Sequence, residues 1–142
     1  MKNNYLKKRI LNGILFITFL FLSTGLMAQL YTKDTDLRND VNAATSGGTF
    51  IVQNGTYNDF SGTFEIMATK ENPIIIKAQT VGGVTLTGGS GFVFRKSAYI
   101  TLEGFVFDGE DKSTIIKFEG SNNIRITRNV FELTTSSSVK WV

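Results

Sequence analysis

The sequence predicts an all-β fold, a right-handed parallel β-helix that follows one short helix. Three observations indicate this fold. Short segments rich in Ile, Val, Phe and Thr alternate with glycine and asparagine turns, the segments recur at a regular period, and phenylalanines recur with the same spacing. A period of about two dozen residues is typical of a solenoid. One coil is too thin to bury its own apolar face, so it needs a coil above and below it.

The N-terminal segment 1–28 has the three-part layout of a secretory signal peptide. Basic residues between Lys2 and Arg9 precede the mostly apolar run Ile10–Leu22, and small and polar residues follow up to Ala28. The apolar run is shorter than the ~20 residues that a membrane-spanning helix needs. We therefore expect cleavage near Ala28, no stable membrane insertion after cleavage, and a secreted or periplasmic protein.

The composition restricts the chemistry that the chain can perform. It has no Cys and no His, which excludes disulfides, thiol nucleophiles, histidine bases and the usual zinc sites. Lys, Arg, Tyr, carboxylates or a hard cation such as calcium remain. Without the four basic residues of the leader, eleven Lys and Arg face twelve Asp and Glu. A near-neutral body lacks the concentrated basic surface that nucleic acid requires.

A capping helix is predicted within the N-terminal segment 29–48, at residues 36–45. Its apolar residues at helical spacing are Leu37, Val41 and Ala44. Asp36 can cap the start of this helix, and the glycine pair that follows can end it. The first edge of a β-helix exposes backbone groups and apolar side chains. The helix is well placed to cover that edge.

The repeat is clearest in four strand starts that recur at nearly equal spacing: Phe50, Ile74, Ile100 and Ile124. Two phenylalanine pairs have the same period, Phe94 with Phe118 and Phe107 with Phe131. We expect these residues to stack on one another in successive coils. A β-sandwich also has short strands and frequent turns, but it gives no reason for this period.

Two segments repeat the same corner. Tyr99–Phe107 and Asn123–Phe131 each contain an apolar and polar alternation, a residue that tolerates positive φ, and a second short strand. Side chains at every second position of a strand point the same way. The expected stack therefore places Ile124 and Ile126 on Ile100 and Leu102. Gly104 and Asn129 are the expected corner residues, one place out of register with each other.

Residues 49–142 are expected to form an incomplete β-helix domain, truncated after about four coils. Ser136–Ser138 reads as a loop, and Val139–Val142 reads as the first strand of another coil. No closing element follows, so the sequence is interpreted as the N-terminal part of a longer protein. An uncovered apolar edge is expected to aggregate or to require a partner.

The succession of Asn54–Tyr57, Asn72–Ala78 and Gly83–Gly88 resembles the opening coils of polysaccharide lyase family 6. That family contains alginate lyases and chondroitinase B-type lyases. Ile100–Phe107 and Asn123–Phe131 continue the resemblance in order and spacing. It therefore covers most of the chain that follows the leader.

The resemblance implies β-elimination on an anionic polysaccharide that contains uronate. In this family calcium neutralises the uronate carboxylate, a lysine removes the adjacent proton, and an arginine assists as the acid. These groups lie on later coils in the family. The resemblance therefore assigns no catalytic, cofactor-binding or metal-binding residue to this chain, and the chain by itself is expected to be inactive.

Two groups of charged residues are candidate sites. Asp108–Ser113 clusters three carboxylates, and calcium binds oxygen ligands, but the spacing does not match a complete calcium loop. A solvated turn is the favoured interpretation. Lys117, Arg125 and Arg128 are spaced to line the outside of neighbouring coils, along an anionic sugar chain. Outward strand positions are also charged simply because they face water, and that interpretation is favoured.

Tyrosines and asparagines supply the remaining candidates. Tyr57 and Tyr99 are candidate acids or sugar-stacking platforms, although packing over the edge of the core is favoured. Asn54–Thr56 is a glycosylation sequon, but its Asn-Gly pair is also a strong turn signal, and the turn is favoured. Asn122–Asn123 is expected at a corner, where Asn tolerates the left-handed conformation and can bond between coils.

The first functional hypothesis is the N-terminal portion of an exported polysaccharide lyase that cleaves alginate or a related uronate polymer. The second is a non-catalytic β-helix that binds carbohydrate or acts as a surface or adhesion module. A third is a different β-helix enzyme, such as a pectin-degrading lyase or hydrolase. A shared fold does not distinguish among them, because function belongs to the sites that a fold carries.

Overall fold

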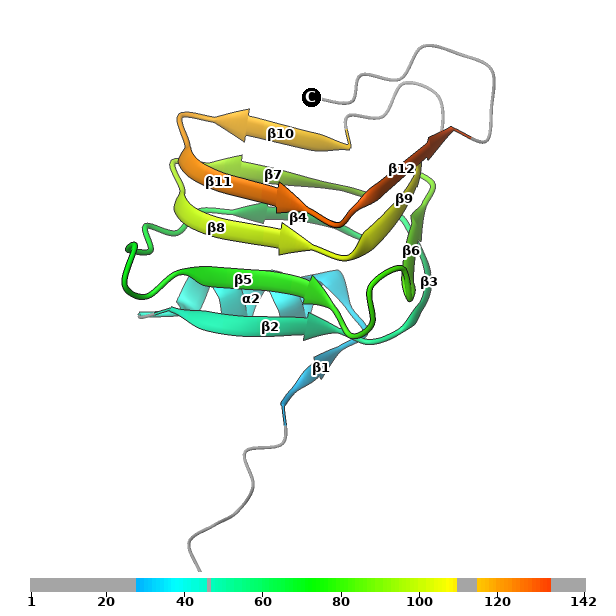
Figure 1. Ribbon diagram of the computed structural model, residues 1–142, viewed down its shortest axis with the longest axis horizontal. Coiled ribbons are helices and arrows are strands. Elements are labelled where there is room, and N and C mark those ends of the chain that lie inside the picture. The colour runs from blue at the N-terminus through cyan, green and yellow to red at the C-terminus, as the bar shows by residue number, and fades with distance from the viewer. Residues whose placement is uncertain (1–27, 46, 110–114, 134–142) are drawn as a thin grey trace, which may run out of the picture.

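The computed structural model describes residues 28–45, 47–109 and 115–133. They form a right-handed parallel β-helix with one short helix at its beginning (Figure 1). Each complete coil contributes one strand to each of three sheets, and successive coils stack along the axis. The predicted fold class is confirmed.

The elements follow one another in coil order. The N-terminal elements are β1 (Leu30–Tyr31) and α2 (Asp34–Ala43). The first coil contains β2 (Gly48–Val52), β3 (Gly55–Asn58) and β4 (Ser61–Phe64). The second contains β5 (Ile74–Ala78), β6 (Val84–Thr87) and β7 (Gly91–Arg95), and the third contains β8 (Ala98–Glu103), β9 (Phe105–Gly109) and β10 (Ile116–Glu119). The described part of the fourth coil contains β11 (Asn122–Thr127) and β12 (Val130–Leu133).

Three parallel sheets run along the axis. Sheet A has the strand order β1-β2-β5-β8-β11, sheet B the order β12-β9-β6-β3, and sheet C the order β10-β7-β4. In Figure 1, sheet A faces the viewer and sheet C runs behind it in the opposite direction. The core lies between these sheets, and their outer faces are the surfaces on which a ligand can lie.

Alternate strand positions fill the core, because side-chain direction alternates along a strand. In β5, Ile74 and Ile76 are fully buried, whereas Ile75 between them is half-buried on the outer face. At the centre, the ring of Phe92 lies edge-on to Phe105 at a centroid distance of 5.8 Å. The coils therefore share one continuous apolar interior and do not form separate small cores.

The register confirms most of the predicted stacking. Ile124 and Ile126 pair with Ile100 and Leu102. The ring of Phe118 stacks on that of Phe94 at a centroid distance of 5.9 Å, and Phe131 stacks on Phe107 at 5.1 Å. Like side chains thus meet in successive coils, which is the physical reason for the period.

In the first coil the predicted register is wrong by two positions. The spacing of strand starts places Phe50 against Ile74, but Gly48 pairs with Ile74, and Phe50 pairs with Ile76. A shift by an even number of positions keeps the same side chains pointing inward. The apolar pattern alone therefore does not distinguish the two registers.

The corners of the third and fourth coils repeat with the period of the strands. The left-handed pairs are Lys96 with Gly120, Tyr99 with Asn123, and Gly104 with Arg128. The predicted corner at Asn129 is wrong by one position, because Arg128 takes the left-handed conformation with φ of 55°. Asn129 instead links the coils. Its side chain accepts the N–H of Phe105 at 2.9 Å and donates to the carbonyl of Leu102 at 3.0 Å.

The predicted helix is present and covers the first edge of the stack. Leu37 and Val41 are fully buried, as its spacing predicts. However, α2 begins at Asp34, so Asp36 lies within the first turn and is not the N-cap. The helix also ends at Ala43, before the glycine pair.

The glycine pair Gly47–Gly48 does not end the helix but permits a close approach of two backbone segments. A Cβ added at Gly47 would lie 2.5 Å from the backbone carbon of Asn72. Glycine therefore permits the chain to pass close to the loop of the second coil at this point. Gly48 follows directly as the first residue of β2.

Polar side chains of α2 satisfy the free edge of β4. Asn42 donates to the carbonyl of Thr63 at 3.1 Å and accepts the N–H of Glu65 at 2.9 Å. Asp34 accepts the N–H of Ser61 at 3.3 Å. These bonds replace the backbone bonds that a preceding coil would supply, so the edge has no need of another strand.

Strand β1, which the sequence pattern does not predict, covers the edge of β2 in sheet A. Tyr31 at its end is buried and donates its hydroxyl proton to Asp40 of α2 at 2.9 Å. Burial, together with this hydrogen bond, raises the pKa of Tyr31 to about 12. The bond ties the capping strand to the capping helix.

The opposite end of the described stack carries exposed apolar side chains on β10 and β12. Phe118 is 39% exposed, Val130 44% and Phe131 37%. Phe94 and Phe107, with which Phe118 and Phe131 pair in the preceding coil, are no more than 1% exposed. The stacked phenylalanines are therefore fully buried in the inner coil and only partly buried in the next coil.

Candidate functional site

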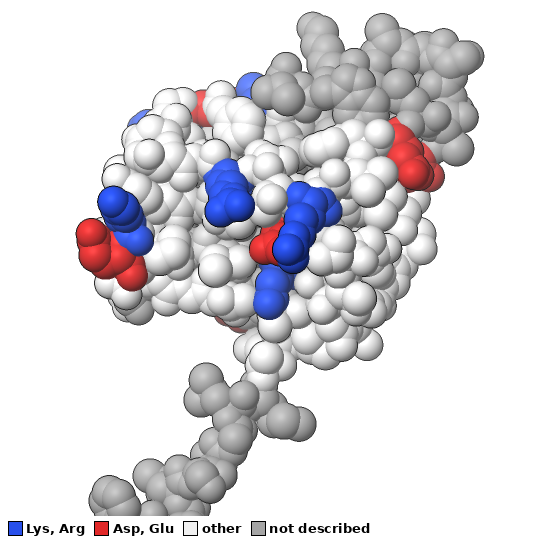
Figure 2. Space-filling model, viewed as in Figure 1, with Lys and Arg blue, Asp and Glu red and all other residues white. Residues whose placement is uncertain are grey.

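The outer face of sheet A carries a basic patch, which consists of Lys77, Arg125 and Arg128 around Glu103. Lys77 pairs with Glu103 across β5 and β8, and Arg125 pairs with Thr101 across β8 and β11. Arg128 lies at the corner after β11, with its Nη1 3.2 Å from Oε1 of Glu103. Figure 2 shows blue groups around a red one on this face. Three basic groups against one carboxylate favour an anionic ligand.

Arg125 and Arg128, two of the three predicted basic residues, are thus brought to the same face. Within the described residues Arg125 is exposed and forms no ion pair. In the pair between Arg128 and Glu103 the arginine side chain is 67% exposed and the glutamate side chain 26%, and ion pairs near the surface contribute little stability. Both guanidinium groups therefore remain accessible to a ligand in solution.

The third predicted residue, Lys117, does not belong to the basic patch. It lies on β10 in sheet C, which runs behind sheet A in Figure 1. A corner of the coil separates β10 from β11. Residues that are close in sequence on either side of such a corner therefore face different directions, and the predicted line of three basic residues is wrong in this respect.

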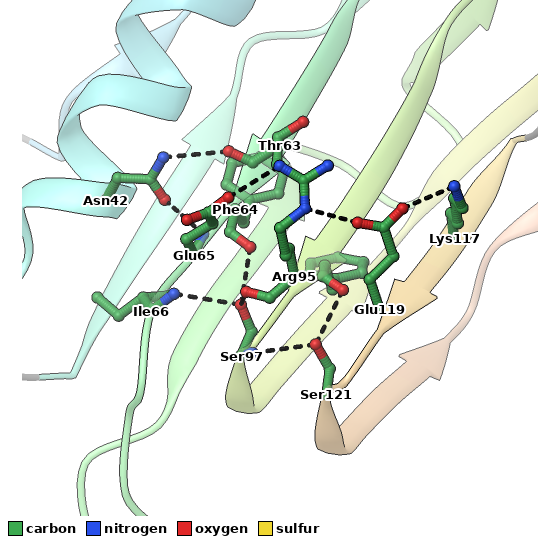
Figure 3. Close-up of polar contacts among 11 residues, drawn as sticks. Asn42, Thr63, Phe64, Glu65, Ile66, Arg95, Ser97, Lys117, Glu119 and Ser121 are labelled. Atoms are coloured by element: carbon green, nitrogen blue, oxygen red, sulfur yellow. Dashed lines mark hydrogen bonds and ion pairs between the residues drawn. The ribbon is translucent and has the colours of Figure 1, made fainter.

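Lys117 instead ends a ladder of alternating charges on the outer face of sheet C (Figure 3). Arg95 donates to Glu65 at 3.0 Å through Nη1 and to Glu119 at 2.5 Å through Nε. The Nζ of Lys117 lies 2.6 Å from the other oxygen of Glu119. Two basic and two acidic residues thus neutralise each other along this face, which makes it a weaker site for an anion than sheet A.

The other three members of this charge ladder are not among the residues predicted from the sequence. A signal was present, because Arg95 and Glu119 have opposite charges and are separated by one period of the repeat. Lys117 and Arg95 lower the pKa of Glu119 to about 2. The carboxylate is therefore charged at any pH at which the β-helix is expected to operate.

Two serines form a second ladder at the corner between sheets C and A (Figure 3). Ser97 Oγ donates to the carbonyl of Phe64 at 2.7 Å and accepts the N–H of Ile66 at 3.1 Å. One coil later, Ser121 Oγ accepts the N–H of Ser97 at 3.0 Å and donates to the carbonyl of Phe94 at 2.8 Å. Each hydroxyl thus satisfies backbone groups of the preceding coil, so both serines have structural roles.

The candidate cation site at Asp108–Ser113 lies mostly outside the described residues. Asp108 is half-buried on β9 and pairs in register with Glu132 of β12. Across the described ranges, no group of three or more acidic side chains is arranged to hold a metal ion. The cation site therefore stays a prediction.

The two candidate tyrosines lie at different places in the fold. Tyr57 packs edge-on to Phe60 at a centroid distance of 5.3 Å and donates to the carbonyl of Gln53 at 2.8 Å. Burial raises the pKa of Tyr57. These contacts agree with the packing interpretation. Tyr99 is half-buried at a corner, in the left-handed conformation with φ of 55°.

The structure places Asn54 and Asn123 at corners, as predicted, but only Asn54 makes a bond between coils. Asn54 lies between β2 and β3, and its side chain donates to Thr80 Oγ1 at 2.9 Å and accepts the N–H of Thr80 at 3.0 Å. Asn123 is left-handed with φ of 53° and donates to the side chain of Asn122 at 2.7 Å. Asn54 thus bonds the first coil to the second, whereas Asn123 bonds within its own corner.

Within the described residues, sheet A carries the basic patch on its outer face and sheet C carries the charge ladder. The side chains of the charge ladder are paired with each other. No helix in the described part of the chain is long and apolar enough to cross a membrane.

Comparison with known proteins agrees with this architecture. A family model described as chondroitinase B matches residues 31–139. The family 6 alginate lyase AlyGC is 28% identical, with a TM-score of 0.65 over 72% of this chain. The family 6 polysaccharide lyase Pedsa3628 from Pseudopedobacter saltans is 26% identical, with a TM-score of 0.60 over 72% of this chain. A comparison with curated protein sequences finds no match.

The chain spans 15% of the length of AlyGC and 24% of the length of Pedsa3628. The similarity therefore concerns a limited part of much longer proteins. The family model nevertheless matches well over half of this chain. The chain belongs to the chondroitinase B family, as its resemblance to polysaccharide lyase family 6 predicts.

Proposed function

We propose that this chain is part of an exported polysaccharide lyase that cleaves an alginate-like, uronate-containing polymer by β-elimination. The observation that carries the proposal is the match of the chondroitinase B family model to residues 31–139. AlyGC, one of the similar structures, is an alginate lyase. The N-terminal leader supports export, since it has the layout of a signal peptide.

The basic patch on sheet A supports an anionic polysaccharide as the partner. A uronate polymer carries one carboxylate per sugar, so it presents a line of negative charges. Lys77 lies on the second coil and Glu103 on the third, and Arg125 and Arg128 lie on the fourth. An extended polymer that lies along the axis can therefore meet basic groups of the second and fourth coils, with the carboxylate of Glu103 between them.

The proposed chemistry requires groups that the described residues do not supply. Calcium would neutralise the uronate carboxylate, but no described acidic cluster is suited to hold a metal ion. No catalytic step is therefore assigned to this chain. We propose that the catalytic lysine and arginine and the calcium ligands are encoded downstream of Val142.

The gene sequence tests this placement directly. Reading the gene past the codon of Val142 is expected to show further coils that carry a lysine and an arginine, with Asn and Glu side chains on the same face. A reading frame without those residues would contradict the lyase and favour a module that only binds carbohydrate.

Enzyme assays test the activity. The product of the whole gene is expected to release unsaturated uronate from alginate in a calcium-dependent reaction, with pectate and dermatan as alternative substrates. The chain that ends at Val142 is expected to release none by itself. Clear turnover by this chain alone would show that its own residues perform the chemistry.

The basic patch also favours a second candidate function, carbohydrate binding without catalysis. A binding module would hold alginate in a salt-dependent manner and would lose affinity when Arg125 is changed to Gln. It would not produce unsaturated products under any condition. A pectin-degrading enzyme, the third possibility, would release unsaturated or hydrolysed products from pectate in preference to alginate.

A further inference from the structure

Asn54, at the corner between β2 and β3, is followed by Gly55, the first residue of β3, and both residues are exposed. In an Asn-Gly pair the backbone nitrogen of Gly can attack the side-chain amide of Asn. The attack forms a five-membered succinimide and expels the amide nitrogen as ammonia. Water then opens the ring to aspartate or isoaspartate. Glycine favours this reaction because it has no side chain to hinder the attack.

The folded structure holds both reacting groups away from this reaction. The nucleophile, the N–H of Gly55, donates to the carbonyl of Gly83 at 2.9 Å. The side-chain amide of Asn54 bonds to Thr80 through both its oxygen and its nitrogen, at 3.0 Å and 2.9 Å. The backbone N–H of Asn54 donates to the side chain of Gln79 at 3.1 Å. All four bonds reach the second coil.

The position of the Asn54 side chain also depends on a glycine in the second coil. A Cβ added at Gly83 would clash with Oδ1 of Asn54. The amide therefore occupies space that exists because residue 83 has no side chain. The restraint on the side chain is thus built from packing as well as from hydrogen bonds.

We propose that Asn54–Gly55 is a deamidation site that the second coil keeps unreactive, so that Asn54 is converted only in molecules whose first two coils have separated. Conversion to isoaspartate inserts a methylene group into the main chain before β3. It also replaces the donor that bonds to Thr80 by a carboxylate oxygen. The strand would then lose its register with β6, and the separation of the coils would become permanent.

The test compares deamidation rates at mildly alkaline pH by peptide mapping and mass spectrometry. The folded chain is expected to react much more slowly than a synthetic peptide of residues 50–59. The variant Thr80→Val, which removes the hydroxyl, is expected to react about threefold to tenfold faster than the wild type, as the loss of one hydrogen bond implies. Thr80→Ser, which keeps the hydroxyl, is the matched control and is expected to match the wild type.

Asn72 provides an internal control, because Pro73 follows it and has no backbone N–H to attack. Equal rates for the folded chain and the peptide would overturn the proposal, and so would equal rates for Thr80→Val and Thr80→Ser. If Thr80→Val lacks the native circular dichroism spectrum, the wild type in increasing urea replaces it. A rate that rises with the unfolded fraction supports the proposal, and a rate independent of urea overturns it.

Discussion

The two ends of the described β-helix differ in how far their edges are covered. At the N-terminal end, β1 covers sheet A, and α2 places the fully buried side chains of Leu37 and Val41 over the core. At the other end of the described stack, Phe118 and Phe131 remain more than a third exposed. A strand and a helix therefore cover the described stack at its N-terminal end, whereas its last described coil, called the open end below, carries partly exposed phenylalanines.

This difference shows that capping a parallel β-helix requires more than an apolar cover. Asn42 and Asp34 bond to the backbone groups of β4 that a preceding coil would otherwise bond. Apolar residues alone would leave those groups unpaired, at a free-energy cost. The cap thus combines buried side chains with polar side chains that imitate a neighbouring strand.

The largest expected loss of stability comes from a substitution in the helix that caps the N-terminal end. Replacing Leu37 by Ala is expected to lower the free energy of unfolding by about 2–5 kcal/mol, because it leaves a cavity under the helix. Urea unfolding followed by circular dichroism measures the change. Asn39→Ala, at an exposed position of the same helix, is the control and is expected to have little effect.

The matching change at the open end is Phe118→Ala. Its expected cost is about 1 kcal/mol, because the ring already meets water on one side. The same variant is expected to reduce self-association in analytical ultracentrifugation, since it removes apolar surface from an exposed edge. A loss of stability equal to that of Leu37→Ala would contradict the distinction between the ends.

A second prediction compares a corner inside the stack with the equivalent corner at the open end. Gly104 has φ of 86°, and a Cβ there would lie 3.3 Å from the backbone of Val81. Gly104→Ala is therefore expected to cost about 1–2 kcal/mol. Arg128→Gly, one coil later, is expected to have no cost or to stabilise, because it relieves a left-handed residue that has a side chain. Thermal unfolding of both variants checks the difference in sign.

A third prediction concerns the polar part of the cap. Asn42→Ala is expected to cost about 1 kcal/mol, because it removes two hydrogen bonds to the edge of β4. Hydrogen exchange at the amide of Glu65 should become faster. Asn42→Asp keeps the acceptor for that amide and should protect it better than Ala does. Unchanged exchange in Asn42→Ala would show that water replaces the side chain without cost.

The smallest expected effect lies near the open end, in the charge ladder of sheet C. The pKa of Glu119 is lowered to about 2, first by Lys117 and then by Arg95. Because the pKa of Glu119 is lower in the folded state than in the unfolded state, its ionised form stabilises the fold at any pH above the unfolded-state pKa. This stabilisation is lost as the pH falls toward about 2. Lys117→Gln is expected to raise the pKa of Glu119, as measured by NMR titration. Lys77→Gln, on sheet A, should leave it unchanged.

Several features of the fold follow from the sequence because they depend on local pattern. The stacking of Phe118 on Phe94 and of Ile124 on Ile100 follows from side chains that alternate along each strand and recur once per coil. The helix over Leu37 and Val41 follows from apolar spacing. In each case the physical cause lies within one or two coils, and the sequence displays it directly.

Other features depend on contacts that the pattern does not reveal. Phe50 pairs with Ile76 because the first coil shifts by two positions, and such a shift preserves the apolar alternation. The left-handed corner residue is Arg128, although residue type predicts Asn129 at that position. The side-chain amide of Asn129 instead bonds to the preceding coil. Residue type alone favours Asn for the left-handed position.

The candidate site shows the same division. The sequence alone predicts the repeat, the residues that point inward and the family, because these depend on residue spacing and on the order of motifs. Only the folded molecule shows that Arg125 and Arg128 share the outer face of sheet A while Lys117 is paired on sheet C. The reason is geometric. A corner of the coil turns neighbouring residues toward different faces, and stacking brings residues of different coils onto the same face.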